Sequence, residues 1–385
     1  MLKLSKVEII KVNIPRNGSF EISRGSFRTA SRVLVRATLQ DGSVGYGECS
    51  PLVGTSDHGA VAIWSEETQS SCYTMIEEQI APALIGADVT NMAAVHATMA
   101  TTTLMNPMAK AGIDIALHDA LGKALGMPVH SLLGGAYRDK IPLAQSVGVR
   151  TDDEVLAGAK KIVDDGFQVI KLKGGRDINA DVKRIELIRK AVGDFPIRLD
   201  ANAGYPAYDQ IILGLMRAQD LGLNELEQPL GRFDLRGMSR IARELHTPLL
   251  ADESVFYAHD AANCIAMEAC DVINIKVQKA GGLFPAIRID HVAQGSKVGV
   301  LVGAVQESGI GTSASLHLAS ACKTMSCASD CRTHLVLENT LLRSTLKVAD
   351  GFADVPQGPG LGIEVDEDAI AKYASGSWKS VGPDA

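Results

Sequence analysis

Two lysines and three carboxylates follow one another at nearly constant intervals in the middle of the chain. Lys173, Asp200, Glu227, Asp252 and Lys276 are separated by 27, 27, 25 and 24 residues, and each closes a short apolar run. One strand, one helix and their two loops need roughly 25 to 30 residues, so this spacing places the five side chains at the same ends of successive parallel strands. The sequence therefore predicts a βα barrel that carries its chemistry at one rim.

The three acids, Asp200, Glu227 and Asp252, are candidate metal ligands. Gathered carboxylates repel one another and lose their water, so folding alone does not favour such a cluster. Carboxylate oxygens suit Mg²⁺, an ion that keeps coordination positions open for substrate oxygens. Each acid taken singly fits an ordinary surface position after a strand. The regular set of three favours a Mg²⁺ site, with Mn²⁺ as a substitute ion.

Lysine side chains occupy the same predicted rim. Lys171 and Lys173 alternate by two in one strand, so both point into the barrel. Lys276 follows a strand four places further round, which is opposite in an eight-stranded barrel, so it faces Lys173 across the substrate. We expect the pKa of Lys173, beside another lysine and a divalent cation, to be lowered toward neutrality, where an amine acts as a general base. A single lysine at a strand end is more often a solvated surface charge.

These residues, with their neighbours, resemble the enolase superfamily, and specifically the muconate-lactonizing (muconate cycloisomerase) subgroup of the mandelate racemase and muconate lactonizing enzyme family. The resemblance is carried by the Lys-x-Lys strand, by Leu-Asp-Ala-Asn, Glu-Gln-Pro and Ala-Asp-Glu-Ser around the three acids, and by Lys279-Ala280-Gly281-Gly282 after Lys276. It extends to residues 109–119, 132–135, 307–311 and 358–362, and so covers nearly the whole chain.

The resemblance implies an isomerase that moves the proton alpha to a substrate carboxylate through a metal-stabilised enolate. The three acids would hold the metal. Lys173 and Lys276 would act as acid and base on opposite faces of the substrate, with Lys171 tuning Lys173. Asn202 is expected to support the metal shell, and Glu307 to hydrogen-bond the substrate or a lysine.

The sequence leaves the particular reaction open. Dipeptide epimerases of this subgroup carry Asp-x-Asp on the eighth strand to bind an ammonium group, whereas this chain has Asp330-Cys331-Arg332. An arginine offers a bidentate partner to a second carboxylate, which favours a muconate-type cycloisomerase. The alternative is a racemase, epimerase or dehydratase of N-acylamino acids, dipeptides or proline derivatives. A non-catalytic barrel used as a binding protein is a further alternative, although all three acids and both lysines remain.

The chain divides into three predicted segments. Residues 1–125 form an α+β capping domain, residues 126–340 a modified TIM-like (β/α)7–8 barrel, and residues 341–385 a tail that returns to the capping domain, as tails do in the resembling family. Residues 7–12 and 31–37 are expected to be antiparallel strands, followed by a hairpin at Asp41-Gly42. The polar, glycine-rich connection within about 16–30 is expected to be a substrate lid, with Phe20 and Arg24 contacting the substrate.

Composition agrees with a soluble enzyme. The chain has 385 residues, 46% of them hydrophobic, and a net charge of −7, which argues against nucleic acid as a partner. No apolar run reaches the roughly 18 residues that span a membrane. Seven cysteines without a Cys-x-x-Cys pair, and an N-terminus without secretory character, predict a cytoplasmic location. The expected partners are a small carboxylate substrate and further copies of the chain, in a homo-oligomer from dimer to octamer.

Overall fold

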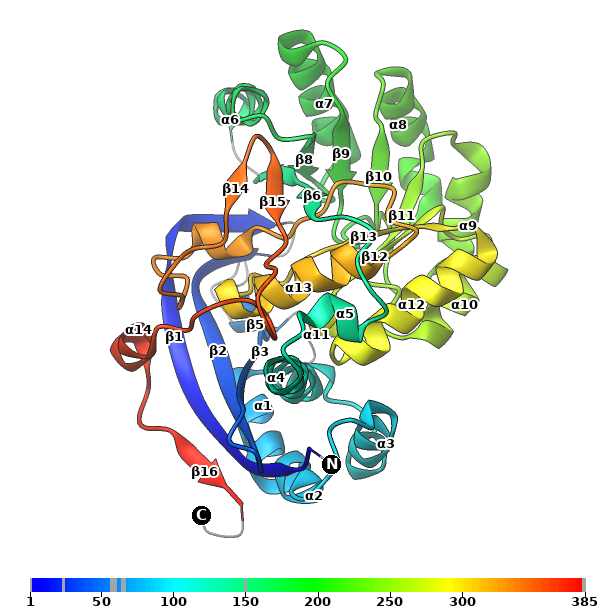
Figure 1. Ribbon diagram of the computed structural model, residues 1–385. Coiled ribbons are helices and arrows are strands. Elements are labelled where there is room, and N and C mark those ends of the chain that lie inside the picture. The colour runs from blue at the N-terminus through cyan, green and yellow to red at the C-terminus, as the bar shows by residue number, and fades with distance from the viewer. Residues whose placement is uncertain (1, 23–24, 56–60, 64–66, 149–150, 383–385) are drawn as a thin grey trace.

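A computed structural model describes residues 2–22, 25–55, 61–63, 67–148 and 151–382. Figure 1 shows an N-terminal antiparallel sheet with several helices packed beside a ring of parallel strands and outer helices. Residues 379–381, near the end of the chain, return to the N-terminal sheet. The two parts meet along α4 (Pro107–Leu125), a helix that is buried over most of its length.

Seven parallel strands form a curved sheet in chain order. They are β7 (Ala144–Val147), β8 (Val169–Lys173), β9 (Ile197–Asp200), β10 (Glu225–Glu227), β11 (Leu249–Ala251), β12 (Val272–Ile275) and β13 (Gly299–Val302). An extended segment joins the two ends, because Met325 bridges Val300 and Ser329 bridges Leu143. The predicted barrel of seven or eight units is confirmed, with the eighth position taken by this segment.

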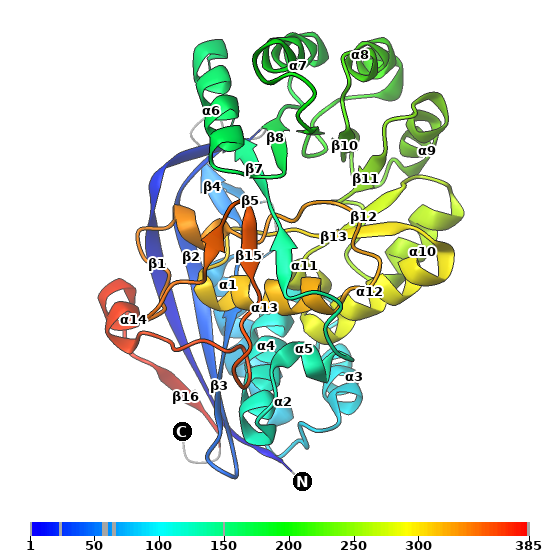
Figure 2. The same cartoon turned by 45° about the horizontal axis from the view of Figure 1, so that its top comes forward.

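Helices cover the outside of the ring, one after nearly every strand (Figure 2). They are α6 (Asp152–Asp164), α7 (Ile178–Val192), α8 (Tyr208–Asp220), α9 (Leu235–Glu244), α10 (Ala258–Ala266), α11 (Val277–Ala280), α12 (Leu283–Ser296) and α13 (Gly309–Ala321). Local sequence fixes several of their starts: Thr151 and Glu154 form a reciprocal capping box at α6.

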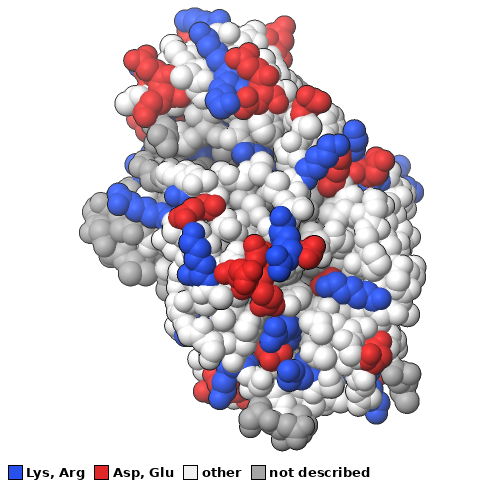
Figure 3. All heavy atoms as spheres, turned by 60° about the vertical axis from the view of Figure 1, so that its left-hand side comes forward, with Lys and Arg blue, Asp and Glu red and all other residues white. Residues whose placement is uncertain are grey.

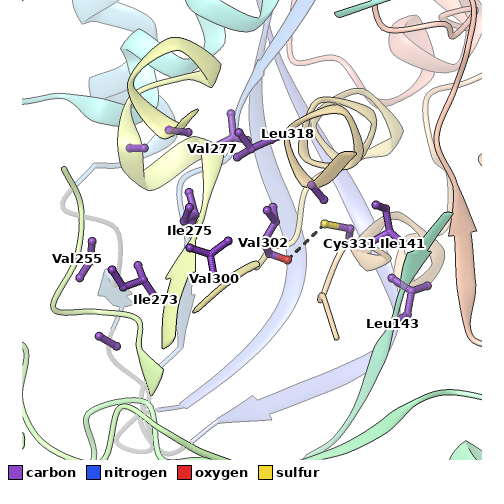
Figure 4. Packing of buried hydrophobic residues seen from close by; sticks show 14 of the residues in the cluster. Ile141, Leu143, Val255, Ile273, Ile275, Val277, Val300, Val302, Leu318 and Cys331 are labelled. Atoms are coloured by element: carbon purple, nitrogen blue, oxygen red, sulfur yellow. Dashed lines mark hydrogen bonds between the residues drawn. The ribbon is translucent and has the colours of Figure 1, made fainter. Parts of the chain in front are cut away.

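Strand alternation separates two environments in the barrel. Outward-facing residues such as Ile273, Ile275 and Val302 pack with α13 through Leu318 in the main core (Figure 4). Inward-facing residues form two small apolar clusters, Ala144 with Val169 and Ala328, and Leu250 with Val272 and Leu301. The next inward-facing residues after Val169 and Val272 are polar, namely Lys171 and Asn274. The barrel is therefore filled by apolar side chains and carries its charged groups at one end.

The capping domain is built on a long hairpin. β1 (Leu4–Ile22) and β2 (Gly25–Leu39) pair antiparallel, and β3 (Val44–Cys49), β4 (Val53–Thr55) and β5 (Val61–Ile63) complete the sheet. Four helical segments precede α4, namely α1 (Gln69–Met75), η1 (Ile76–Ile80), α2 (Ala81–Leu84) and α3 (Met92–Thr102); α5 (Val129–Leu132) follows it. Glycines in β3 let α4 approach closely, since a Cβ at Gly47 would lie 2.0 Å from the carbonyl oxygen of Gly112.

The predicted strands at 7–12 and 31–37 are confirmed, but both strands are longer and extend into the connection expected at about 16–30. β1 continues to Ile22 and β2 starts at Gly25, with a register shift between Pro15 and Phe20. The partner strand supplies hydrogen bonds that the polar, glycine-rich composition does not reveal. Phe20 pairs in register with Phe27, and Arg24 lies outside the described residues. The lid role of this hairpin stays a prediction.

The C-terminal segment adds to both parts. β14 (Val348–Ala349) and β15 (Phe352–Asp354) form a small sheet with β6 (Lys140–Pro142), and η2 (Thr333–Val336) and α14 (Glu367–Tyr373) lie on either side of them in the chain. β16 (Lys379–Val381) pairs antiparallel with β1. The guanidinium of Arg36 stacks over the Trp378 ring at 4.5 Å. Both ends of the chain therefore contribute strands to one sheet.

The surface mixes charges of both signs on the face drawn in Figure 3, where Asp and Glu side chains alternate with Lys and Arg. Among the described residues, no helix is both long enough and apolar enough to span a membrane. All seven cysteines are unpaired thiols.

Candidate active site

Lys171 lies at the centre of the polar end of the barrel. Its Nζ is 2.8 Å from Glu227 Oε2, 3.1 Å from Asp200 Oδ2 and 2.7 Å from Asp330 Oδ2. Burial lowers the pKa of Lys171, but the charges of the three carboxylates outweigh burial and hold it well above its ordinary value. Lys171 is thus a fixed cation that links the ends of β8, β9, β10 and the closing segment.

Lys173 occupies one side of the rim, two residues further along β8. Its Nζ donates to Asp200 Oδ2 at 2.5 Å and to Asn202 Oδ1 at 3.1 Å. Asn202 in turn donates its backbone N–H to Asp200 Oδ1 at 2.9 Å, in a left-handed conformation with φ 45°. Such strained backbone clusters at functional sites. Asn202 therefore supports the Asp200 carboxylate and the Lys173 ammonium together.

Lys276 occupies another part of the rim, at the end of β12, and donates to Asp252 Oδ2 at 2.6 Å. A third residue joins them, because Lys279 Nζ donates to Asp252 Oδ1 at 2.8 Å. Burial raises the pKa of Asp252, but the two lysines outweigh it and hold that pKa far below its usual range. Asp252 itself raises the pKa of Lys276 against the effect of burial.

Glu227 stands between these two groups at the end of β10. Besides Lys171 it receives a hydrogen bond from Asn274 Nδ2 at 2.9 Å, and its Oε2 lies 3.7 Å from Arg198 Nη1. The pKa of Glu227 is raised above its usual value, because burial and the neighbouring Asp200 outweigh the opposite effects of Lys171 and Arg198. Glu227 is thus held by two cations and one amide at the inward face of the barrel.

The donor set fits Mg²⁺ in its chemistry. Asp200, Glu227 and Asp252 are almost fully buried, end three adjacent strands and offer hard oxygen ligands. Within the described part of the chain no three His, Cys, Asp or Glu side chains converge as a metal site; each of the three carboxylates is paired with a lysine. The ligand role of the three acids stays a prediction.

Glu307 follows β13 and is fully buried. Its Oε2 accepts hydrogen bonds from the backbone N–H of Val305 at 2.9 Å and from Thr333 Oγ1 at 3.1 Å, and its Oε1 has no partner among the described residues. Burial and the nearby Glu48 raise the pKa of Glu307 to about 7. No lysine is among these partners; its predicted contact with substrate stays a prediction.

Glu48 is a functional-site neighbour that sequence reasoning missed. It comes from β3 and accepts hydrogen bonds from the backbone N–H groups of Ser308 at 2.9 Å and Gly311 at 2.9 Å, at the N-terminus of α13. Arg32, also buried, lies 3.2 Å from Glu48. An acid at a helix N-terminus is favourable, so the capping domain fixes the segment that carries Glu307.

Asp330 and Arg332 follow the segment that closes the barrel. Asp330 faces the site, since it binds Lys171. The Arg332 guanidinium lies 5.0 Å from the Phe167 ring centroid and lines a small cavity with Asp330. The substrate-binding role predicted for Arg332 stays a prediction.

Two polar residues of the barrel interior, Arg198 and Asn274, were also missed in the sequence analysis, although the alternation of side chains along a strand could have revealed them. Arg198 precedes Asp200 by two residues in β9, and Asn274 of β12 precedes by two residues Lys276, which directly follows that strand. Each therefore shares the inward face with a residue that the sequence analysis recognised. Lys279 follows Lys276 by one turn of the short α11. Glu253 is adjacent to Asp252 and accepts a bond from Asn202 Nδ2 at 3.3 Å; no alternation signal marks it.

Comparison with known proteins agrees with this geometry. A profile described as "Mandelate racemase / muconate lactonizing enzyme, N-terminal domain" matches residues 4–134, and one described as "Enolase C-terminal domain-like" matches residues 154–369. The chain belongs to the mandelate racemase and muconate lactonizing enzyme family of the enolase superfamily, whose similar members are racemases, epimerases and cycloisomerases. It therefore belongs among isomerases.

Three relatives illustrate the range of the similarity. The N-succinyl-L-Arg/Lys racemase of Bacillus cereus is 31% identical over 96% of this chain and 97% of its own length. The muconate lactonizing enzyme of Pseudomonas fluorescens, solved with muconolactone, has a TM-score of 0.91 at 30% identity, covering 97% and 99% of the two chains. The dipeptide epimerase of Cytophaga hutchinsonii, solved with Mg and D-Ala-L-Val, has a TM-score of 0.90 at 28% identity, covering 99% and 100%.

Proposed function

We propose that this protein is a Mg²⁺-dependent enzyme that moves the proton alpha to a substrate carboxylate. The observation that carries the proposal is the pairing of ammonium and carboxylate groups on different strands of the rim, Lys173 with Asp200 and Lys276 with Asp252. Mg²⁺ held by Asp200, Glu227 and Asp252, or Mn²⁺ in its place, would offset the second negative charge that develops on the substrate carboxylate. The Mg-containing epimerase structure is a further support.

The residues of the chain would divide the remaining work. Lys173 and Lys276 approach the alpha carbon from different strands, and a neutral amine on either can accept the proton while an ammonium on the other can donate one. Lys171 and Arg198 hold Glu227 in place, and Lys279 holds Asp252. Asn202 positions Asp200 and Lys173. These positioning residues keep the reacting groups fixed while the substrate changes charge.

The particular reaction that we propose is a muconate-type cycloisomerisation, an intramolecular lyase step. Arg332 beside the site suits a substrate with a second carboxylate, and the fold is very similar to that of a muconate lactonizing enzyme solved with its lactone. In this reaction one lysine transfers the proton, while the other stabilises charge. The predicted lid at about 16–30 would exclude water during the step.

A second candidate is racemisation or epimerisation, in which one lysine removes the alpha proton and the other returns one from the opposite face. The equivalent pairing of both lysines with rim carboxylates favours it, as does the 31% identity with an N-succinyl-amino-acid racemase. Dehydration of a proline derivative would use the same first step. We further propose a cytoplasmic location and a homo-oligomer; the unpaired state of all seven thiols supports the former.

Incubation with candidate substrates in heavy water and Mg²⁺ tests the proposal. The panel contains cis,cis-muconates, N-acylamino acids, dipeptides and hydroxyproline derivatives, and deuterium at the alpha carbon is scored by NMR. Lactone formation from a muconate would support cycloisomerisation, whereas exchange into N-acylamino acids or dipeptides with muconates untouched would replace it by the second candidate. Absence of exchange and turnover across the panel would contradict both.

A further inference from the structure

We propose that Asp181 and Tyr205, two buried residues behind the rim, are positioning residues that set the place of Lys173 relative to Asp200. They act through the backbone turns that follow β8 and β9. The inference rests on the proposed function, in which Lys173 transfers the proton, and it adds two residues that lie outside the barrel interior. Asp181 is 1% exposed and Tyr205 is 3% exposed.

The Asp181 carboxylate joins the two turns. Its Oδ2 accepts the Gly175 N–H at 2.8 Å, two residues after Lys173, and also accepts the Tyr205 hydroxyl at 2.8 Å. Asp181 lies in the first turn of α7, and Tyr205 lies in the loop that leads into α8. These two helices stand side by side outside β8 and β9 (Figure 2). Burial and the charge of Asp181 raise the pKa of Tyr205 well above its usual value, so the hydroxyl keeps the proton that it donates. One oxygen atom therefore holds both turns.

The two turns also touch each other directly. The Gly174 N–H donates to the Asp200 carbonyl oxygen at 2.9 Å. A Cβ at Gly175 would lie 2.1 Å from the Ala201 carbonyl oxygen, and one at Gly204 would lie 2.5 Å from the Gly175 carbonyl oxygen. Glycine permits this close approach of backbone to backbone. A displacement of one turn is therefore passed to the other, because closely packed atoms leave no free space between them.

The turn after β9 is strained, and Tyr205 anchors its end. Asn202 and Ala203 both have left-handed backbone conformations, with φ 45° and 55°. Such backbone persists only where its surroundings hold it. The side chain of Asn202 accepts the Lys173 Nζ at 3.1 Å. Loss of the hydrogen bond between Tyr205 and Asp181 should therefore let the turn relax and carry Asn202 away from Lys173.

Lys276 provides an internal reference for this effect. It follows β12 and donates to Asp252. The described hydrogen bonds of Asp181 and Tyr205 connect instead to α7 and to the loops after β8, β9 and β10. A positioning role predicts a change at Lys173 without a change at Lys276, whereas a general loosening of the barrel would affect both lysines alike.

Competitive chemical labelling of the lysines tests the inference in the full-length protein with Mg²⁺. The probe is acetic anhydride at trace concentration, and peptide mass spectrometry gives the acetylation rate of Lys173 relative to that of Lys276. The test variant is Tyr205→Phe, which removes only the hydroxyl. The control is Tyr208→Phe, which makes the same change at the start of α8, where the tyrosine ring packs on the Arg240 guanidinium at 3.7 Å.

We expect Tyr205→Phe to change the ratio of the two rates roughly three- to tenfold, because one buried hydrogen bond is lost. Tyr208→Phe should keep the parent ratio. Asp181→Ala should change the ratio at least as much as Tyr205→Phe, and Asp181→Asn, which keeps an acceptor oxygen, should restore most of it. If melting shows that Asp181→Ala does not fold, Tyr205→Phe decides the question. The parent ratio in Tyr205→Phe, whether both rates stay the same or both rise together, would overturn the inference.

Kinetics of alpha-proton exchange separate this inference from the proposed function. Tyr205→Phe should lower kcat for the exchange that Lys173→Ala abolishes and leave KM nearly unchanged, because the substrate contacts remain. A selective change in labelling needs no substrate, so it would support the inference even if no substrate exchanged its alpha proton. Exchange at the parent rate by Tyr205→Phe, together with the parent labelling ratio, would leave the proposed function standing and overturn the positioning role.

Discussion

At the scale of single residues, the rim is a set of charges that compensate one another. Lys171 alone contacts three carboxylates from three different parts of the barrel. The positions of Asp200, Glu227, Asp252 and Lys276 at the rim were predictable from their nearly constant spacing in the sequence. Each of them stands at the end of one strand, on its inward face. Partners such as Arg198 and Asn274 follow from the same alternation. Glu48 and Arg32 did not follow, because their contact with α13 depends on how two distant segments pack.

The first prediction concerns Lys173 and Lys276, the two lysines proposed as acid and base. If the reaction is a racemisation, Lys173→Ala and Lys276→Ala should each exchange the alpha proton of only one enantiomer, and of opposite enantiomers, since each lysine serves one face. If it is a cycloisomerisation, only one of the two variants should lose proton transfer, and the other should lose charge stabilisation. NMR of each enantiomer in heavy water measures this. Equal partial losses without stereochemical asymmetry would argue against distinct roles.

At the scale of elements, acids from the capping domain stabilise helices of the barrel. Glu48 of β3 accepts bonds at the start of α13, and Asp114 of α4 accepts the Leu283 N–H at 2.5 Å at the start of α12. Negative charge at a helix N-terminus is favourable. The barrel helices themselves were predictable from period and spacing. These long-range caps were not, and neither was the length of the β1–β2 hairpin, whose polar residues conceal the alternation.

A second prediction concerns α13 and the tail, which meet at His317. Its ring is fully buried, with Nδ1 accepting from the His130 N–H at 3.3 Å and Nε2 paired with the Leu361 carbonyl oxygen at 3.1 Å. Burial lowers the pKa of His317 to about 4 from 6.5. As the pH falls, His317 is therefore protonated in the unfolded chain at a higher pH than in the folded protein. The stability that this histidine contributes is complete above pH 6.5 and is lost as the pH drops toward 4.

The variant His317→Gln should still offer one hydrogen-bond donor and one acceptor, but its side chain cannot be protonated in this pH range. Between pH 7 and pH 4.5 the variant should lose less unfolding free energy than the parent protein, by about 2 kcal/mol. Denaturant unfolding at several pH values measures the difference. Parallel pH profiles for the two proteins would show that His317 does not titrate in this window.

At the scale of the whole molecule, the rim joins side chains from many separate parts of the chain, while β1 near the N-terminus and β16 near the C-terminus pair in the capping sheet. The family and the barrel architecture were predictable because the spacing of strands is regular along the sequence. The substrate was not, since the rim brings residues of β8 to β12 together with Asp330, more than 150 positions after Lys171. No local pattern connects them.

The third prediction concerns Mg²⁺ and global stability. A cation that binds only the folded protein stabilises it by mass action, by about 2.7 kcal/mol at a hundredfold excess over Kd. Thermal melting after dialysis against a chelator should therefore shift upward when Mg²⁺ is added. Asp252→Asn should lose most of this shift, whereas Glu268→Gln, which removes an exposed carboxylate on the outside of the barrel, should keep it. A shift of the same size in both variants would place the bound cation elsewhere.

The proposed mechanism requires the three rim acids to hold a cation that makes the alpha proton removable. The most direct measurement is the rate of alpha-proton exchange in heavy water by the parent protein and by Glu227→Gln, at Mg²⁺ concentrations well below millimolar, with folding checked by melting. The variant keeps the shape of the side chain but loses one negative charge, so exchange should fall by roughly a hundredfold or more, and chelation should abolish it in the parent. Exchange by Glu227→Gln at the parent rate, or exchange that survives chelation, would contradict the account.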